Sequence, residues 1–190
     1  MKLKTEKHFF ILPILIFCLT IKNFAQTKYS VDKFDVKISG SSNLHDWTAN
    51  ITGLQGSFII ADTDINNVGI TVNAEKIKSS EGRIMDAKMQ KALKTEKFPL
   101  IFYNSETMKK LSGNEKSFTV QATALLTVAG VKQTIKHKVI CKKTKNEIQA
   151  SGSFFIFMSD YGIKPPTAMF GALKTDNKVK IDFYVIFKQI

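Results

Sequence analysis

Cysteine is scarce in this sequence, which has 190 residues and only Cys18 and Cys141. Cys18 falls in an N-terminal segment that we expect to be removed, so the remaining chain cannot form an internal disulfide. Its fold must therefore be held together by an apolar core. Cys141 alternates with Ile135 and Val139, which predicts a buried side chain and not a reactive thiol.

The usual catalytic signatures are missing as well. There is no Gly-x-Ser-x-Gly elbow, no phosphate-binding loop and no His-Glu-x-x-His. After residue 25 the only histidines are His45 and His137, too few for a zinc site without further ligands. We therefore expect no cofactor, no metal and no catalysis. An enzyme acting on a lipid headgroup, with His45 as the base, is a minor alternative, because the neighbouring Asp46 would point to the opposite face of a strand.

The first 25 residues differ from the rest of the chain. A basic start with Lys2, Lys4 and Lys7 is followed by an apolar run over residues 9–21 and a small residue at Ala25. This order is typical of a cleaved secretory signal peptide. A transmembrane anchor is the alternative, but the run is shorter than the roughly 20 apolar residues that span a bilayer. We predict one exported domain, residues 26–190, in the periplasm or secreted.

Acidic residues are outnumbered, and the formal net charge is +12. Residues 1–25 hold four lysines and one glutamate, so the remaining chain has a net charge of +9. Such a charge favours anionic surfaces such as membrane headgroups. Nucleic acid is not an expected partner of an exported protein.

Apolar and polar residues alternate with period two through most of the remaining chain, which predicts β-strands. The alternation is strongest in residues 33–38, 68–75, 118–128 and 179–187. Weaker strand signals cover residues 44–51, 56–61, 100–108, 134–142 and 148–157. Turn signals separate them, among them residues 40–43 and Asn66-Asn67. Many short strands at this spacing predict an all-β sandwich or barrel.

One segment, residues 81–95, has helical periodicity instead. Met85, Met89 and Leu93 are four residues apart and share one helical face. Ser79 or Ser80 can cap the start of this helix. Later in the chain, residues 159–177 contain two glycines and two prolines and predict a long loop, a common place for function.

Arginine is the rarest basic residue, since Arg83 is the only one among 28 lysines and arginines. Its planar fork grips a carboxylate or phosphate with two parallel hydrogen bonds. Two interpretations stay open: a contact to the polar head of a ligand, or a structural ion pair with Asp86 or Glu81.

The only tryptophan, Trp47, shares a strand face with His45. A buried tryptophan usually finds a partner for its N–H, so both residues are either ordinary core or part of a ligand chamber. The 15 phenylalanines add bulk to the interior. An eight-stranded barrel can fill its interior with such side chains or hold one ligand, and periodicity does not distinguish the two.

Four motifs resemble the YceI-like, polyisoprenoid-binding family. They are the Gly-Ser-Ser-Asn-Leu-His-Asp-Trp run of residues 40–47, the helix of residues 82–94 with Phe-Pro-Leu-Ile-Phe at 98–102, residues 126–133, and residues 158–163. They follow one another in the family's order over nearly the whole chain after residue 25.

This resemblance implies an extended, lipocalin-like, eight-stranded antiparallel barrel with one α-helix inserted mid-chain. It also implies an exported protein that holds a long isoprenoid or other lipid in an apolar tunnel without turnover. Headgroup candidates are then Arg83, His45 and Trp47. The apolar lining candidates are the following: Val36, Ile38, Ile70, Val72, Met85, Met89, Phe118, Val120, Leu126, Phe154, Ile156, Phe170, Phe183 and Val185. A filled barrel that acts through its basic surface is the rival hypothesis.

Overall fold

The computed structural model describes residues 26–61, 64–168 and 172–190. Residues 1–25, assigned above to a signal peptide, and the lining candidate Phe170 lie outside these ranges. Within them, no helix is both long enough and apolar enough to cross a membrane.

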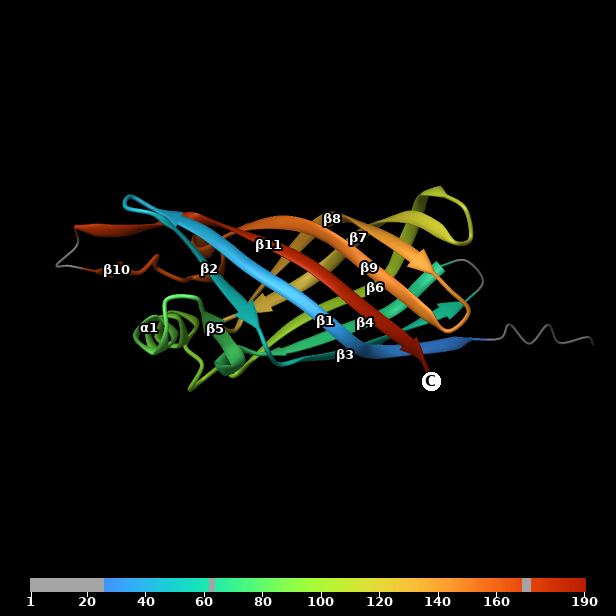
Figure 1. Ribbon diagram of the computed structural model, residues 1–190, viewed down its shortest axis with the longest axis horizontal. Helices are drawn as coiled ribbons and strands as arrows, with labels where there is room; N and C mark the ends of the chain where they lie inside the picture. The colour runs from blue at the N-terminus through green and yellow to red at the C-terminus, as the bar shows by residue number, and fades with distance from the viewer. Residues whose placement is uncertain (1–25, 62–63, 169–171) are drawn as a thin grey trace, which may run out of the picture.

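The chain folds into a closed antiparallel barrel (Figure 1). Hydrogen-bonded neighbours follow the order β10-β11-β9-β8-β7-β6-β4-β3-β1-β2-β5, and a further pairing of β11 with β1 closes the ring. The strands, in chain order, are β1 (Thr27–Ser42), β2 (Asp46–Ile51), β3 (Leu54–Ala61), β4 (Asp64–Asn73), β5 (Ile77–Ser79), β6 (Leu100–Gly113), β7 (Ser117–Val128), β8 (Val131–Lys143), β9 (Glu147–Phe157), β10 (Thr167–Ala168) and β11 (Leu173–Gln189).

Eight positions around the wall are filled, because β2 and β3 share one of them. β1 pairs with β3 through residues 27–30 and with β2 through residues 37–41. The predicted eight-stranded antiparallel barrel, with a single α-helix among the described residues, is confirmed.

Two predicted turns are in fact parts of strands. β1 continues through Gly40 to Ser42, because Gly40 pairs with Trp47 and gives the indole room. The Asn66-Asn67 signal marks a β-bulge inside β4, where Asn67 and Val68 lie opposite the single residue Phe58. Asn67 has φ 52°, a left-handed conformation that asparagine tolerates well.

The helix α1 (Arg83–Leu93) is shorter than predicted and begins differently. Gly82 is its N-cap, with φ 87°, and no side chain caps the first turn. Ser79 and Ser80 are therefore not the cap. Instead the Asp86 carboxylate accepts a hydrogen bond of 2.6 Å from the backbone N–H of Ser79, which ties the first turn of α1 to β5.

The predicted long loop at residues 159–177 is only partly a loop. It contains the 3-10 helix η2 (Met158–Tyr161) and β10, and β11 already begins at Leu173. A second 3-10 helix, η1 (Ala74–Lys76), leads from β4 to β5. Together α1, β5 and the β10–β11 segment lie at one end of the barrel, opposite the C-terminus (Figure 1).

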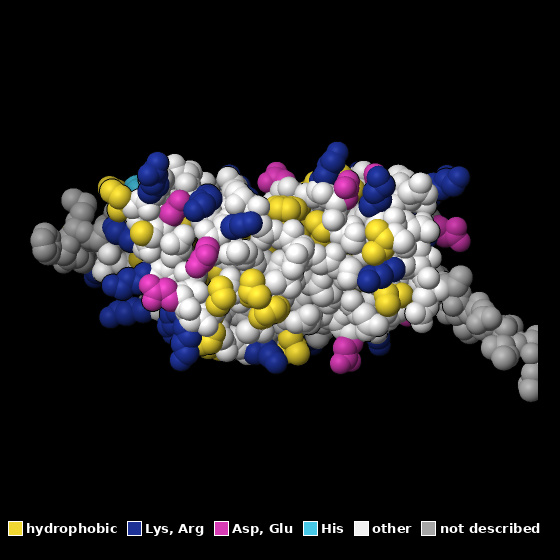
Figure 2. Space-filling view, turned by 90° about the horizontal axis from the view of Figure 1, so that it is seen from below, with side chains coloured by type: hydrophobic (Ala, Val, Ile, Leu, Met, Phe, Trp, Pro, Cys, Tyr) yellow, Lys and Arg dark blue, Asp and Glu magenta, His cyan; other side chains and the backbone are white. Residues whose placement is uncertain are grey.

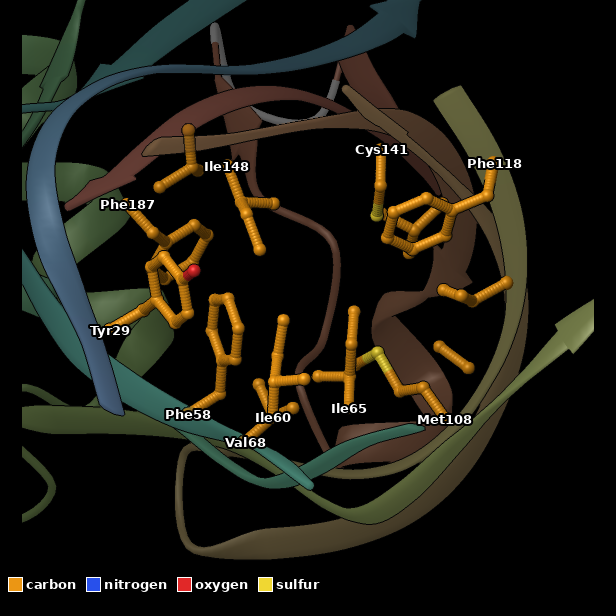
Figure 3. Close-up of a cluster of buried hydrophobic side chains, with 14 of the residues drawn as sticks. Tyr29, Phe58, Ile60, Ile65, Val68, Met108, Phe118, Cys141, Ile148 and Phe187 are labelled. Carbon is orange, nitrogen blue, oxygen red and sulfur yellow. The ribbon is translucent and has the colours of Figure 1, made fainter. Parts of the chain in front are cut away.

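The inward side chains of alternate strand positions form the core. Figure 3 draws 14 of them as sticks, among them the labelled Phe58, Met108 and Cys141, which project from the wall strands toward the barrel axis. Cys141 is 1% exposed, which confirms its predicted burial. A second cluster lies nearer to α1 and includes Leu126, Met158 and Val179. Tyr103 and Ile181 pack against both clusters and so lie between the two halves of the barrel.

Candidate ligand cavity

The barrel interior holds a cavity of about 470 Å³. This lies within the usual range of small-molecule sites, roughly 300–1,000 Å³. Its walls are almost entirely apolar and come from every barrel strand and from α1. The more exposed lining residues, such as His45 and Thr167, belong to the α1 end, so the cavity reaches solvent there.

Most of the predicted lining residues lie on this cavity. Those in the wall are Val36, Ile38, Ile70, Val72, Met85, Met89, Leu126, Phe154, Ile156, Phe183 and Val185. His45 and Trp47 line it as well. The barrel is therefore hollow among these residues, which argues against a filled interior.

Phe118 and Val120 do not line the cavity, contrary to the prediction. Both are buried, at 8% and 1% exposed, in the core cluster that also holds their cross-strand partners Cys141 and Val139, which do line the cavity. The Lys110 ammonium lies 5.6 Å from the centroid of the Phe118 ring. Alternation identifies which face a residue takes, but it does not show which inward side chains border free space and which are covered by their neighbours.

The motif of residues 40–47 builds one side of the cavity mouth. The indole N–H of Trp47 donates to the Ser41 carbonyl at 3.2 Å. The Asn43 side chain donates to the Ala172 carbonyl at 2.8 Å and accepts from the Lys174 N–H at 2.9 Å. The β1–β2 hairpin is thereby fixed to the start of β11, which positions His45 and Trp47 at the rim.

Ionisable side chains meet across this mouth. Nδ1 of His45 lies 3.5 Å from a carboxylate oxygen of Glu81 and 2.9 Å from the Asp46 carbonyl. Lys88 also lines the cavity from α1. Because both partners of the His45–Glu81 pair are solvent-accessible, their attraction is screened and contributes little to stability.

Arg83 lies elsewhere. It is exposed on the first turn of α1 and is not part of the cavity lining. Among the described residues it makes no ion pair: Glu81 pairs with His45, and Asp86 pairs with Lys78 at 3.6 Å. The helix instead presents Met85, Met89, Ala92 and Leu93 to the cavity and covers its mouth with an apolar face.

A polar pair lies deeper inside, between Tyr103 of β6 and His137 of β8. The Tyr103 hydroxyl is 2.9 Å from Nε2 of His137, and the imidazole stacks on Phe154 with centroids 4.7 Å apart. Burial raises the pKa of Tyr103 and lowers the pKa of His137. The sequence interpretation missed Tyr103, although its place among the inward positions of residues 101–105 was a visible signal.

The thiol of Cys141 also lies on the cavity wall. Burial raises the pKa of the Cys141 thiol to about 12, so the nucleophilic thiolate is absent at neutral pH. Among the described residues, no group of three or more His, Cys, Asp or Glu side chains could hold a metal ion.

A closed antiparallel barrel with an apolar internal cavity and a helix beside its mouth defines a lipocalin-like protein. A family model for the YceI-like domain matches residues 23–187, and the chain belongs to that family. No curated protein matches the sequence.

Several solved structures share the fold. A polyisoprenoid-binding domain from Saccharophagus degradans, implicated in plant cell wall breakdown, is 15% identical with a TM-score of 0.70, over 85% of this chain and 98% of that one. BcnA from Burkholderia cenocepacia is 14% identical with a TM-score of 0.66, over 82% and 98%. A YceI protein from Campylobacter jejuni is 16% identical with a TM-score of 0.57, over 75% and 84%.

Proposed function

We propose that this protein binds an isoprenoid or another long-chain lipid inside its barrel and holds it without changing it chemically. The apolar cavity of about 470 Å³ carries the proposal. Each buried CH₂ group contributes about 0.8 kcal/mol, so a long chain gains affinity without any specific polar contact. The polyisoprenoid-binding domain of the same fold supports this ligand class.

The polar end of a bound lipid would lie at the mouth. His45 and Lys88 both line the cavity there, beside Glu81. Lys88 supplies a positive charge that an anionic head can reach while its tail stays in the barrel. Arg83, five residues earlier on the helix, faces solvent and would meet only a head that projects beyond the rim.

Native mass spectrometry tests the binding directly. Protein incubated with a polyprenyl lipid should show a one-to-one complex, and the released lipid should have its original mass. A complex with a changed lipid mass would indicate an enzyme. Absence of any complex across polyprenyl and straight-chain lipids would refute the carrier function.

We propose further that the protein is exported and that its mouth faces an anionic membrane. The signal-like order of residues 1–25 supports export. N-terminal sequencing of the envelope fraction should find a chain that starts near Gln26. An intact Met1 on membrane-embedded protein would contradict export with cleavage. Leu44 and Ile84, at 68% and 78% exposure, are exposed apolar side chains beside the mouth. Figure 2 shows Lys and Arg side chains gathered at the same end of the molecule.

Cosedimentation with vesicles tests the membrane contact. Wild type should bind vesicles of phosphatidylglycerol more strongly than vesicles of phosphatidylcholine. The variant Leu44→Asp/Ile84→Asp should bind roughly tenfold more weakly, because two apolar contacts are lost. Leu111→Asp is the matched control, since Leu111 is 51% exposed at the far end of β6. Equal loss in both variants would contradict the orientation.

A further inference from the structure

Within the described part of the chain, the hydrogen-bonded pair of Tyr103 and His137 is the one strongly polar contact in the middle of an otherwise apolar cavity. Both Tyr103 and His137 line the cavity. Phe154 stacks on the imidazole, and Phe183 meets it edge-on at 5.7 Å between ring centroids. Burying a polar group without a partner costs free energy, so each hydrogen-bond donor and acceptor of this pair needs a partner.

The surroundings assign the proton positions. Nδ1 of His137 lies 3.4 Å from the Lys138 carbonyl oxygen, which can only accept, so Nδ1 carries the ring proton. Nε2 is then an acceptor, and the Tyr103 O–H must donate to it across 2.9 Å. The Tyr103 oxygen has no hydrogen left to offer, and its lone pairs are its only remaining capacity.

A ligand group that meets this oxygen must therefore be a donor. Ketones, esters and ethers would set acceptor against acceptor. Phosphates and carboxylates would in addition bring a charge into an apolar interior, which is unfavourable. A hydroxyl group fits, because it donates one hydrogen bond and carries no charge.

We propose that the Tyr103–His137 pair is an internal binding site for the hydroxyl group of a neutral lipid alcohol, with the alcohol O–H donating to the Tyr103 oxygen. This inference rests on the proposed carrier function and adds a second polar position inside the barrel. Charged heads stay at the mouth near Lys88, and a neutral hydroxyl passes deeper. The rest of the alcohol lies against the apolar walls on either side of the pair.

The first test compares geranylgeraniol with its methyl ether, which has the same chain but no O–H donor. Wild type should bind the alcohol roughly 3- to 10-fold more tightly, the range of a single net hydrogen bond. If neither probe binds, the carrier function itself fails. If both bind equally, the carrier function stands and the hydroxyl site is refuted.

The second test removes the pair. Tyr103→Phe/His137→Leu replaces both partners with apolar groups of similar size, so that no unpaired polar atom remains. A single Tyr103→Phe change is less informative, because Nε2 of His137 would then accept from the alcohol itself. The double variant should keep wild-type affinity for the ether and lose the preference for the alcohol. Retention of that preference would overturn the proposal. Tyr184→Phe is the matched control, since Tyr184 is 41% exposed on the barrel surface.

A measurement on wild type does not depend on how the variant folds. Binding of the alcohol should polarise the Tyr103 O–H and shorten its hydrogen bond to Nε2. The ¹⁵N resonance of Nε2 of His137 should therefore shift with geranylgeraniol and stay in place with the ether. The sequence has three histidines, which makes the assignment simple. The same shift with both probes would show that occupancy of the cavity, and not a hydroxyl contact, moves the resonance, and would overturn the proposal.

Discussion

The indole ring of Trp47 lies over Gly40, its cross-strand partner in the β1–β2 hairpin, and fills the space that a Cβ would occupy. The sequence motif that resembles the family thus has a steric basis. Glycine lets the only tryptophan of the chain lie flat at the cavity mouth, with its N–H bonded to Ser41.

Gly40→Ala should therefore displace Trp47. Overpacking of this kind costs about 1–3 kcal/mol, and the change should also weaken lipid binding because the rim moves. Thermal denaturation and the fluorescence of the single tryptophan report both effects. Gly69→Ala is the control: an added Cβ there meets only Asn104 Oδ1 at 3.6 Å, an ordinary contact. Equal losses in the two variants would contradict the steric account.

Ala150→Phe should shorten the chain length that the barrel accepts. Ala150 lines the cavity from β9, opposite Cys141, so a phenyl ring there would occupy ligand space. Affinity for long prenyl chains should fall more than affinity for short ones. Ala87→Phe, on the exposed face of α1, is the matched control and should bind like wild type. A length profile unchanged by Ala150→Phe would mean that the tail lies elsewhere.

Stability should fall as the pH drops below about 6.5, the ordinary pKa of histidine. Burial lowers the pKa of His137 in the folded state, so the unfolded chain binds a proton more readily. The stabilisation from neutral His137 is complete above pH 6.5 and is lost toward its lowered folded pKa, by at most about 1.4 kcal/mol per pH unit.

Urea denaturation between pH 7.5 and 5 measures this dependence. The Tyr103→Phe/His137→Leu variant should show a much flatter profile over the same interval. A steep profile in the double variant would assign the effect to other groups.

Two substitutions on α1 distinguish the roles of its basic side chains. Lys88→Gln should weaken binding of a polyprenyl phosphate by about 0.5–1.5 kcal/mol, an effect reduced by salt, and leave the matching alcohol unaffected. Arg83→Lys should change neither the affinity nor the melting temperature, because Arg83 is exposed and has no described ion-pair partner. If only Arg83→Lys lost affinity for the phosphate, the contact to the lipid headgroup would be assigned to Arg83 and not to Lys88.

The wall of the barrel could be predicted from sequence because alternation reports burial directly. Residues 118–128 and 179–187 show this clearly, since both fall inside long strands. The turn signals were less reliable. Asn67 lies in a β-bulge, and Gly40 makes room for the Trp47 ring, so both residues are required by contacts with the partner strand. Local chemistry cannot distinguish a residue that ends a strand from one that accommodates a neighbour.

The candidate site, like the fold, could be predicted only in part. Which residues face inward followed from period two, and most of the expected lining residues lie on the cavity. Which inward side chains border free space did not follow, because that depends on how side chains from different strands pack against one another. Phe118 is buried without lining the cavity, although its cross-strand partner Cys141 lines it. Tyr103 is hydrogen-bonded to His137, 34 positions later in the chain.

The pairing of β1 with β11 has a consequence for how the molecule is made. The first and the last strand of the described barrel close the wall, with pairs that run from Tyr29–Gln189 to Ser42–Thr175 and two register shifts between them. Until β11 is in place, β1 and β9 each present an unpaired edge and the interior is open to water, which invites association between chains. Loss of the last strand would therefore leave an open, curved sheet with two unpaired edges that favour aggregation, and with no enclosed cavity.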